Sequence, residues 1–232
     1  MSEYTKIGFV GTPDYPIPAV KGGAIQTLVG ALIDQNEMIH KYDFTVFTID
    51  DPMIKNHKMK YKFTNIIPIK INIVEKCALI IRKIIRRISR NKIKYKSAYM
   101  EKINSYIENH QFDMIIFEST DKEAIQGPSK EDTIMIYHVH SDYLSNSTER
   151  IHTLCIKCKY FIAVSEFIKN RLLMIECLNK EQVFVLNNAV DVKKQSEQSV
   201  EYDRNAIRMK YGLGKTDKVI IYCGRLSPEK DV

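Results

Sequence analysis

Tyr160-Phe161-Ile162-Ala163-Val164-Ser165-Glu166-Phe167-Ile168 passes from an apolar run directly into the start of a helix. The apolar run has the length of a buried strand. Ser165 suits the N-cap of a helix predicted from Glu166 to Ile175, because its hydroxyl can accept a hydrogen bond from a free backbone N–H. A strand that leads straight into a helix is the repeating unit of a parallel sheet. The stretch therefore predicts an α/β protein.

The rest of the chain repeats this alternation of strands and helices. After Gly22-Gly23, a helix is predicted with an apolar face formed by Ile25, Leu28, Val29, Leu32 and Ile33. The fold class that follows is α/β, a Rossmann-like parallel sheet flanked by helices. The predicted strands are Lys6 to Val10, Phe44 to Ile49, Asn65 to Ile69, Met114 to Phe117, Ile134 to Val139, Tyr160 to Val164, Gln182 to Leu186 and Lys218 to Cys223.

Length and composition narrow the possible classes. With 232 residues, 44% of them hydrophobic, the chain can form one large domain or one and a half ordinary ones. It has no cationic leader and no apolar run of membrane-spanning length, so a cytoplasmic location is expected. The five cysteines agree with a reducing compartment. Cys155 and Cys158 form a CxxC without a second pair and are predicted to be packing residues, not metal ligands.

The domain organisation follows from two segments near the end of the chain. The polar stretch Lys193 to Asp203 has no apolar period and is predicted to be a linker. The last residues suggest a strand, a Gly-Arg turn and the first turn of a helix at Pro228 and Glu229. We expect a first Rossmann-like domain at residues 1–192, a linker at 193–216, and the truncated start of a second α/β domain at 217–232. A function that needs both domains would be incomplete in this chain.

The loop from Gly11 to Gly23 joins the first predicted strand to the first helix. Such a loop lies at the carboxyl edge of a parallel sheet, where ligands bind, and glycines before a helix let phosphate oxygens approach backbone N–H groups. The alternative is that the loop needs flexible residues only to turn. This segment alone does not separate the two interpretations.

Four segments, taken in order, resemble the retaining glycosyltransferases of family 4, which have the GT-B fold of two facing Rossmann-like domains. The resemblance runs from about Lys6 to Val232, and the chain would be the N-terminal, acceptor-side domain with the start of the donor-binding domain. The segments are Ile134 to Asp142, Tyr160 to Ile168, Val183 to Asp191, and Gly224-Arg225-Leu226-Ser227-Pro228-Glu229-Lys230.

The resemblance implies roles for individual residues. Gly22 and Gly23 match the glycine pair near the donor diphosphate, and His140 matches a histidine near the transferred sugar. Arg225 and Lys230 match a basic pair that neutralises the departing diphosphate, a role that needs no metal. The chain departs from the family at Ala189, where glycine is usual, and it lacks the spaced glutamates of the nucleotide-binding helix.

Each of these residues also has a purely structural interpretation. A histidine at a strand end is more often a satisfied, partly buried residue than a catalytic one, and only the motif context favours a function for His140. His138 lies two residues away on the same face of the pleat but matches no family motif, so a structural role is predicted. Arg225 and Lys230 would ordinarily be solvated surface charges. They lie, however, where anions bind best.

The stretch from Lys76 to Met100 contains no acidic residue. On a helical wheel its isoleucines and its basic residues fall on opposite sides. Either the isoleucines pack on the sheet and the basic residues face water, or the helix binds an anionic membrane surface. The net charge of +7 fits such a surface, and no motif supports nucleic acid binding. The membrane-surface candidates are Arg82, Lys83, Arg86, Arg87 and Arg90.

The function expected from the resemblance is transfer of a sugar, with retention, from a nucleotide sugar to a hydroxyl of a glycan or lipid-linked acceptor. It would serve bacterial-type polysaccharide, lipopolysaccharide or glycolipid synthesis, at the inner face of the cytoplasmic membrane, without a cofactor or metal. One alternative is a non-catalytic half that binds acceptor or membrane and needs a separate donor-binding polypeptide. Another is a plain Rossmann nucleotide-binding enzyme, for which the first loop is the only support, and this loop lacks a G-x-G-x-x-G fingerprint.

Overall fold

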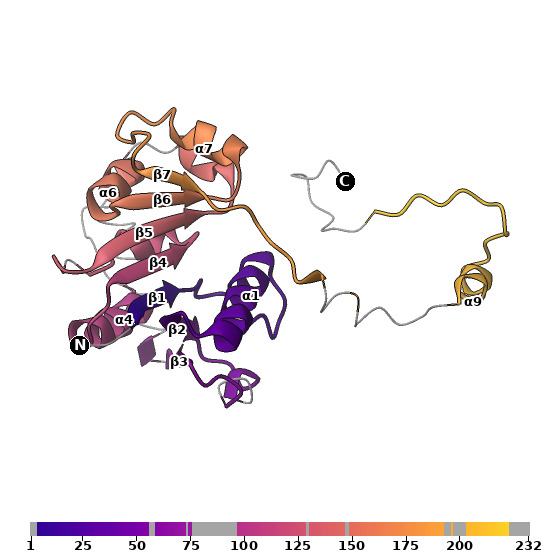
Figure 1. Ribbon diagram of the computed structural model, residues 1–232, viewed down its shortest axis with the longest axis horizontal. Helices are drawn as coiled ribbons and strands as arrows, with labels where there is room; N and C mark the ends of the chain where they lie inside the picture. Colours follow the sequence, from indigo (N-terminus) through magenta and orange to yellow (C-terminus); the bar gives the residue numbers. More distant parts are fainter. Residues whose placement is uncertain are drawn as a thin grey trace. The chain divides into compact units, whose positions relative to one another are not determined.

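Seven strands form one parallel sheet in the order β3-β2-β1-β4-β5-β6-β7 (Figure 1). The computed structural model describes residues 4–55, 59–72, 74–75, 97–128, 130–146, 149–192, 196 and 203–222. The chain divides into two units, Met1–Val190 and Asp191–Val232. The strands are β1 (Thr5–Val10), β2 (Tyr42–Ile49), β3 (Thr64–Ile69), β4 (Met114–Glu118), β5 (Ile134–Val139), β6 (Tyr160–Ala163) and β7 (Val183–Val185).

The parallel α/β fold predicted from the sequence is confirmed, and each predicted strand before the linker is found within two residues of its expected ends. The eighth predicted strand, Lys218 to Cys223, was wrong for its described part. Residues 218–222 form no strand, and Ile220 is 99% exposed. A parallel strand is stable only when neighbours satisfy its backbone and cover its faces, and the described residues offer this segment neither.

The described helices lie between strands, except α9, which follows the last strand. They are α1 (Ala24–Ile39), α4 (Ala98–Glu108), α5 (Asp121–Ala124), the 3-10 helix η1 (Asp142–Asn146), α6 (Glu149–Lys157), α7 (Glu166–Leu172) and α9 (Arg204–Lys210). Ser165 caps α7 as predicted, because its hydroxyl accepts from the N–H of Ile168 at 3.3 Å. The predicted linker, residues 193–216, contains the whole of α9, whose N-cap is Asp203. Among the described helices, none combines the length and the apolar character needed to span a bilayer.

Two apolar cores lie on opposite faces of the sheet, as the alternation of side chains along a strand requires. On one face, Val29 and Ile33 of α1 pack with Phe9 of β1. On the other, α4 and α6 cover the strands, and Tyr137 of β5 packs in the same cluster as Ile103. Figure 1 shows α1 on one side of the sheet, with α4 and α6 on the other. The sheet is therefore the middle of three layers.

The buried face of α1 differs from the predicted one. Its buried residues are Gln26, Val29, Ile33 and Asn36, while Leu32, which belongs to the predicted apolar face, is 40% exposed. Two polar residues thus take part in the helix packing. Asn36 is buried there because its side chain bonds the backbone of the turn that leads into β2. Its Nδ2 donates to the carbonyl of Tyr42 at 2.9 Å, and its Oδ1 accepts from the N–H of Tyr42 at 3.0 Å.

We expect the change Asn36→Ala to lower the free energy of unfolding by about 2 kcal/mol, because it removes a buried side chain and leaves partly buried backbone groups of this turn without partners. Urea denaturation measures the loss. Asn109→Ala is the matched control, since Asn109 is exposed at the end of α4, and it should cost less than about 1 kcal/mol. Equal losses of unfolding free energy in the two variants would show that the Asn36 hydrogen bonds stabilise the fold no more than those of an exposed asparagine.

One of the cysteines forms a disulfide that the sequence did not predict. Cys155 in α6 pairs with Cys177, with their Cα atoms 6.3 Å apart, while Cys158 is buried and unpaired. Both cysteines of the CxxC do pack in the core on the α4 side, Cys158 as a buried member and Cys155 as a partly buried one, so the prediction of packing residues is confirmed. The pairing of Cys155 was not predicted. The pairing joins residues on either side of β6, and spacing along the sequence does not reveal such a contact.

Candidate functional site

The candidate site lies at the carboxyl edge of the sheet, near its topological switch point. From β1 the chain proceeds to β2 and β3 on one side, and β4 to β7 follow on the other. In open α/β sheets, ligands bind at the carboxyl ends of the strands where the order reverses, here between β1 and β4. The loops after these two strands are neighbours. Glu123 follows β4, and Asp14 follows β1. Burial is the main cause that raises the pKa of Glu123, and the negative charge of Asp14 is close enough to raise this pKa further.

The glycine pair precedes the first turn of α1. Gly22 and Gly23 have φ angles of 78° and 108°, in the region that favours glycine. A Cβ atom on Gly23 would lie 2.1 Å from Oε1 of Gln26. Gly23 is the N-cap but offers no side chain to the helix, and no acidic residue lies in the first turn. The N–H groups of Ala24 and Ile25 find no acceptor among the described residues, which leaves them open to an anion.

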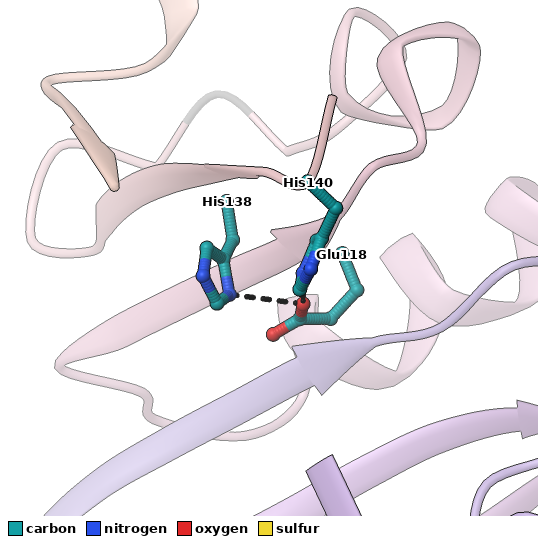
Figure 2. A group of neighbouring side chains, drawn as sticks. All are labelled: Glu118, His138 and His140. Carbon is teal, nitrogen blue, oxygen red and sulfur yellow. Dashed lines mark hydrogen bonds and ion pairs between the residues drawn. The ribbon is translucent and has the colours of Figure 1, made fainter. Parts of the chain in front are cut away.

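A cluster of three side chains, Glu118, His138 and His140, lies at the ends of β4 and β5 (Figure 2). Glu118 is the last residue of β4 and is paired in register with His138 of β5. His140 follows β5 directly. The neighbours Phe117, Tyr137 and Val139 belong to the core on the α4 side. Alternation therefore places the cluster on the opposite face, the one on which α1 packs.

Both histidines contact the same oxygen of Glu118. His140 Nε2 lies 2.8 Å from Oε2 and His138 Nδ1 lies 3.0 Å from it. The side chain of Glu118 is 1% exposed, and those of His138 and His140 are 8% and 9% exposed. The centroids of the two imidazole rings lie 4.1 Å apart. The cluster is thus a buried carboxylate held by two rings, one from within β5 and one from the residue that follows it.

The backbone of Ser119 fixes the end of β4 against β5. Ser119 has a positive φ of 51°. Its N–H donates to the carbonyl of His138 at 3.0 Å, and its Oγ accepts from the N–H of His140 at 3.1 Å. The strained turn and its hydrogen bonds hold the two strand ends together, which sets the distance between the carboxylate and the rings.

Electrostatics favour the ionised form of Glu118. Burial by itself raises the pKa of this carboxyl group, but the hydrogen bonds and charges of His138 and His140 outweigh it and hold the pKa below its ordinary value of 4.5. Two buried polar atoms of the cluster have no partner among the described residues, namely Oε1 of Glu118 and Nε2 of His138.

The predicted site residues can be placed in part. His140 lies in the cluster, and Gly22 and Gly23 lie at the same edge of the sheet. The prediction that His138 and His140 share a face is confirmed by their common contact with Glu118. Outside the described residues lie Arg225, Lys230, Arg82, Lys83, Arg86, Arg87 and Arg90. Their predicted roles stay predictions.

Sequence reasoning missed Glu118. The predicted strand ended one residue earlier, at Phe117, and the acidic residue after it was not considered. A signal was present, because a carboxylate directly after an apolar central strand lies at the edge where ligands bind. Its partners were not visible, since Glu118 and His138 are separated by a helix and a loop and meet only through the register of β4 and β5.

A pocket of about 640 Å³ opens at the opposite, amino-terminal edge of the sheet. Lys6, Asp43 and Thr64, at or near the starts of β1, β2 and β3, are among its lining residues, together with Tyr106 and His110. None of the cluster residues and neither glycine of the pair lines it. We place the candidate site at the carboxyl edge because the convergent polar groups lie there.

Comparison with known proteins gives one sequence relative and one solved structure of interest. The chain is 23% identical over 232 residues to the Bacillus subtilis protein named "Putative glycosyltransferase YtcC". The match includes 97% of the chain and 50% of the relative, so the chain spans about half of the relative's length. A crystal structure of UDP-N-acetylglucosamine 2-epimerase matches 89% of the chain and 52% of that protein, with a TM-score of 0.48 and 11% identity. No family model matches the chain.

Proposed function

We propose that this chain forms one Rossmann-like half of a glycosyltransferase that uses a nucleotide sugar as donor. The observation that carries the proposal is the sequence match to a putative glycosyltransferase along 97% of the chain. Two features at the carboxyl edge of the sheet support it. The open N-terminus of α1 follows β1, and the buried Glu-His cluster lies at the ends of β4 and β5, of which β4 is the neighbour of β1. Backbone N–H groups suit a diphosphate, and an imidazole suits a sugar hydroxyl.

The proposed chemistry is transfer of a hexosyl-type sugar with retention at the anomeric carbon. The bond from this carbon to the diphosphate breaks, and the leaving diphosphate keeps the electron pair. A bond to the acceptor oxygen forms, and the proton of the acceptor hydroxyl passes to the leaving diphosphate. His140 would lie beside the transferred sugar, and the first turn of α1 beside the diphosphate. Arg225 and Lys230 would stabilise the negative charge that develops there, so that no metal is required.

The proposed partners follow from the sequence resemblance. The acceptor would be a hydroxyl of a glycan or a lipid-linked glycan, in polysaccharide, lipopolysaccharide or glycolipid synthesis. The basic stretch containing Arg82, Arg86 and Arg87 would bring the protein to an anionic membrane surface on its cytoplasmic side. Nucleic acid is not proposed as a partner.

A second candidate function rests on the length of the match, since the chain spans half of its relative. In this alternative the chain is a non-catalytic, acceptor-binding or membrane-binding half that needs a separate donor-binding polypeptide. The two candidates differ in whether the Glu118 cluster takes part in chemistry, and mutation of His140 separates them.

The chain by itself is expected to bind nucleotide sugars only feebly, with a Kd of about 1 mM or weaker, and to show no transferase activity. The described site offers groups for a diphosphate and a sugar, but base and ribose are held by the other domain in enzymes of the proposed class. Calorimetric titration with uridine, guanosine and thymidine diphosphate sugars measures this affinity.

The control is the same titration after addition of a donor-binding domain, supplied as a fusion or as a separate polypeptide. Affinity should then rise by at least about tenfold, which is about 1.4 kcal/mol. Micromolar binding by the chain alone would contradict the two-domain proposal. No binding of any nucleotide sugar by the combined protein would contradict the donor class.

A further inference from the structure

The Glu118 cluster has the composition of a metal site, but its distances are those of hydrogen bonds. Two ligand atoms bound to one tetrahedral zinc at about 2.0–2.1 Å lie roughly 3.3 Å apart. The two ring nitrogens lie instead 2.8 and 3.0 Å from Oε2 of Glu118. These are the lengths of hydrogen bonds from N–H groups to a carboxylate. Both contacts also converge on one oxygen, where a chelated ion would stand between the groups.

Hydrogen bonding to one oxygen decides which nitrogen of each ring carries the proton. An ionised carboxylate can only accept, so the nitrogen that faces it must donate. His138 then donates from Nδ1 and His140 donates from Nε2. The remaining nitrogen of each neutral ring is an acceptor. For His138 this is Nε2, which is buried without a partner among the described residues. For His140 it is Nδ1, and this residue, the first after β5, is only partly buried.

We propose that Glu118 is a positioning residue for His140, which it holds in the Nε2–H tautomer so that Nδ1 is presented to the ligand as a hydrogen-bond acceptor. His138 contributes to this arrangement, because its Nδ1–H donates to the same carboxylate oxygen and holds the Glu118 side chain in place. The group that His140 recognises is therefore a hydroxyl that donates, and the nucleotide sugar of the proposed function carries several. In this respect the inference rests on that function.

The turn at Ser119 holds both histidines by their backbones. Its Oγ accepts from the backbone N–H of His140, and its own N–H donates to the carbonyl of His138. Both histidines are thus held at the backbone as well as at the ring. With backbone and Nε2 fixed, the imidazole of His140 has little freedom to turn, which is what a group that recognises a hydroxyl requires.

The test is the tautomeric state of the two rings in the chain itself. Two-bond proton–nitrogen correlation spectra of nitrogen-labelled protein distinguish protonated from unprotonated ring nitrogens. They are recorded at about pH 8.5, two units above the ordinary histidine pKa of about 6.5. We expect opposite tautomers for two residues that are neighbours on one strand face: Nδ1–H for His138 and Nε2–H for His140. The wild-type spectrum alone gives this result.

Substitution of Glu118 tests whether this carboxylate is what fixes the His140 tautomer. Glu118→Leu removes the acceptor, so the His140 signals should move to those of a mixture of both tautomers. Glu108→Leu is the matched control, because Glu108 is exposed at the end of α4, and it should leave both rings unchanged. If Glu118→Leu does not fold, the wild-type tautomers still decide the proposal.

Two results would overturn the inference. One is the opposite tautomer in either ring of the wild-type protein. The other is stoichiometric loss of both ring N–H signals on addition of Zn²⁺, which would show a metal site in place of the hydrogen-bonded cluster. Neither measurement contains a donor sugar. A wrong tautomer therefore leaves the glycosyltransferase proposal standing, and failure of the donor titration leaves the tautomer assignment standing.

Discussion

Replacing Glu118 with alanine should lower the free energy of unfolding by about 3 kcal/mol or more. The change removes two hydrogen bonds to a charged group, each worth about 1.5–3 kcal/mol, and leaves a cavity at a fully buried position. Relief from desolvation does not cancel this loss, because the pKa of Glu118 lies below its ordinary value in spite of burial, which shows that the two histidines outweigh the desolvation penalty. Urea denaturation at neutral pH measures the effect.

The pH dependence of stability checks the same assignment. A carboxyl group with a lowered pKa in the folded state contributes stability that is present above its unfolded pKa and is lost as the pH falls. Wild-type protein should lose this contribution as the pH drops below 4.5, the ordinary value for Glu118. The alanine variant should lack that part of the acid slope. Glu108→Ala, at an exposed helix end, is the control. An unchanged slope in the Glu118 variant would show that the carboxylate is not held in ionised form.

The second large effect is expected on catalysis. In the two-domain transferase proposed above, His140→Ala should lower turnover by roughly 10²-fold or more, as for removal of one hydrogen-bonding group at a reacting centre. The fold should persist, because Glu118 keeps its hydrogen bond from His138. Initial-rate transfer of labelled sugar, with a matched thermal denaturation curve, measures both quantities.

Two histidines serve as comparisons. His152→Ala changes an exposed residue of α6 and should leave turnover unchanged. His138→Ala should lower stability, since it leaves Glu118 held from one side only, but should lower turnover less than about tenfold. Equal losses of turnover in the His138 and His140 variants would place the reacting group elsewhere. Full turnover in the His140 variant would favour the non-catalytic alternative.

Much of the fold was predictable because its signals are local. Apolar runs such as Ile134 to Val139 mark buried parallel strands, and Ser165 marks the start of a helix by its own hydrogen bond. Two features depended on tertiary context. Asn36 lies on the buried side of α1 because of a turn that forms only when β2 is in place. The run at Ile220 has the composition of a strand but has no partner strand among the described residues.

The site was predictable only from its family resemblance and its place at the strand ends. His140 was found in this way, whereas His138 and Glu118 needed the register of β4 against β5. A structural role was predicted for His138, and its ring does form a hydrogen bond within the cluster. Its partner, Glu118, lies 20 positions earlier in the chain. Pattern along one strand shows which residues share a face. It does not show what faces them from the next strand.

One edge of the sheet bears on how the protein behaves at high concentration. β3 is an outer strand, and it contains Pro68, which is paired in register with Thr48 of β2. Proline has no N–H to donate, and exposed edge strands otherwise offer a template for pairing with another chain. An interruption of this kind discourages a second molecule from extending the sheet at β3. Exchange of Pro68 for valine would restore the missing donor and make sheet-to-sheet association at this edge easier.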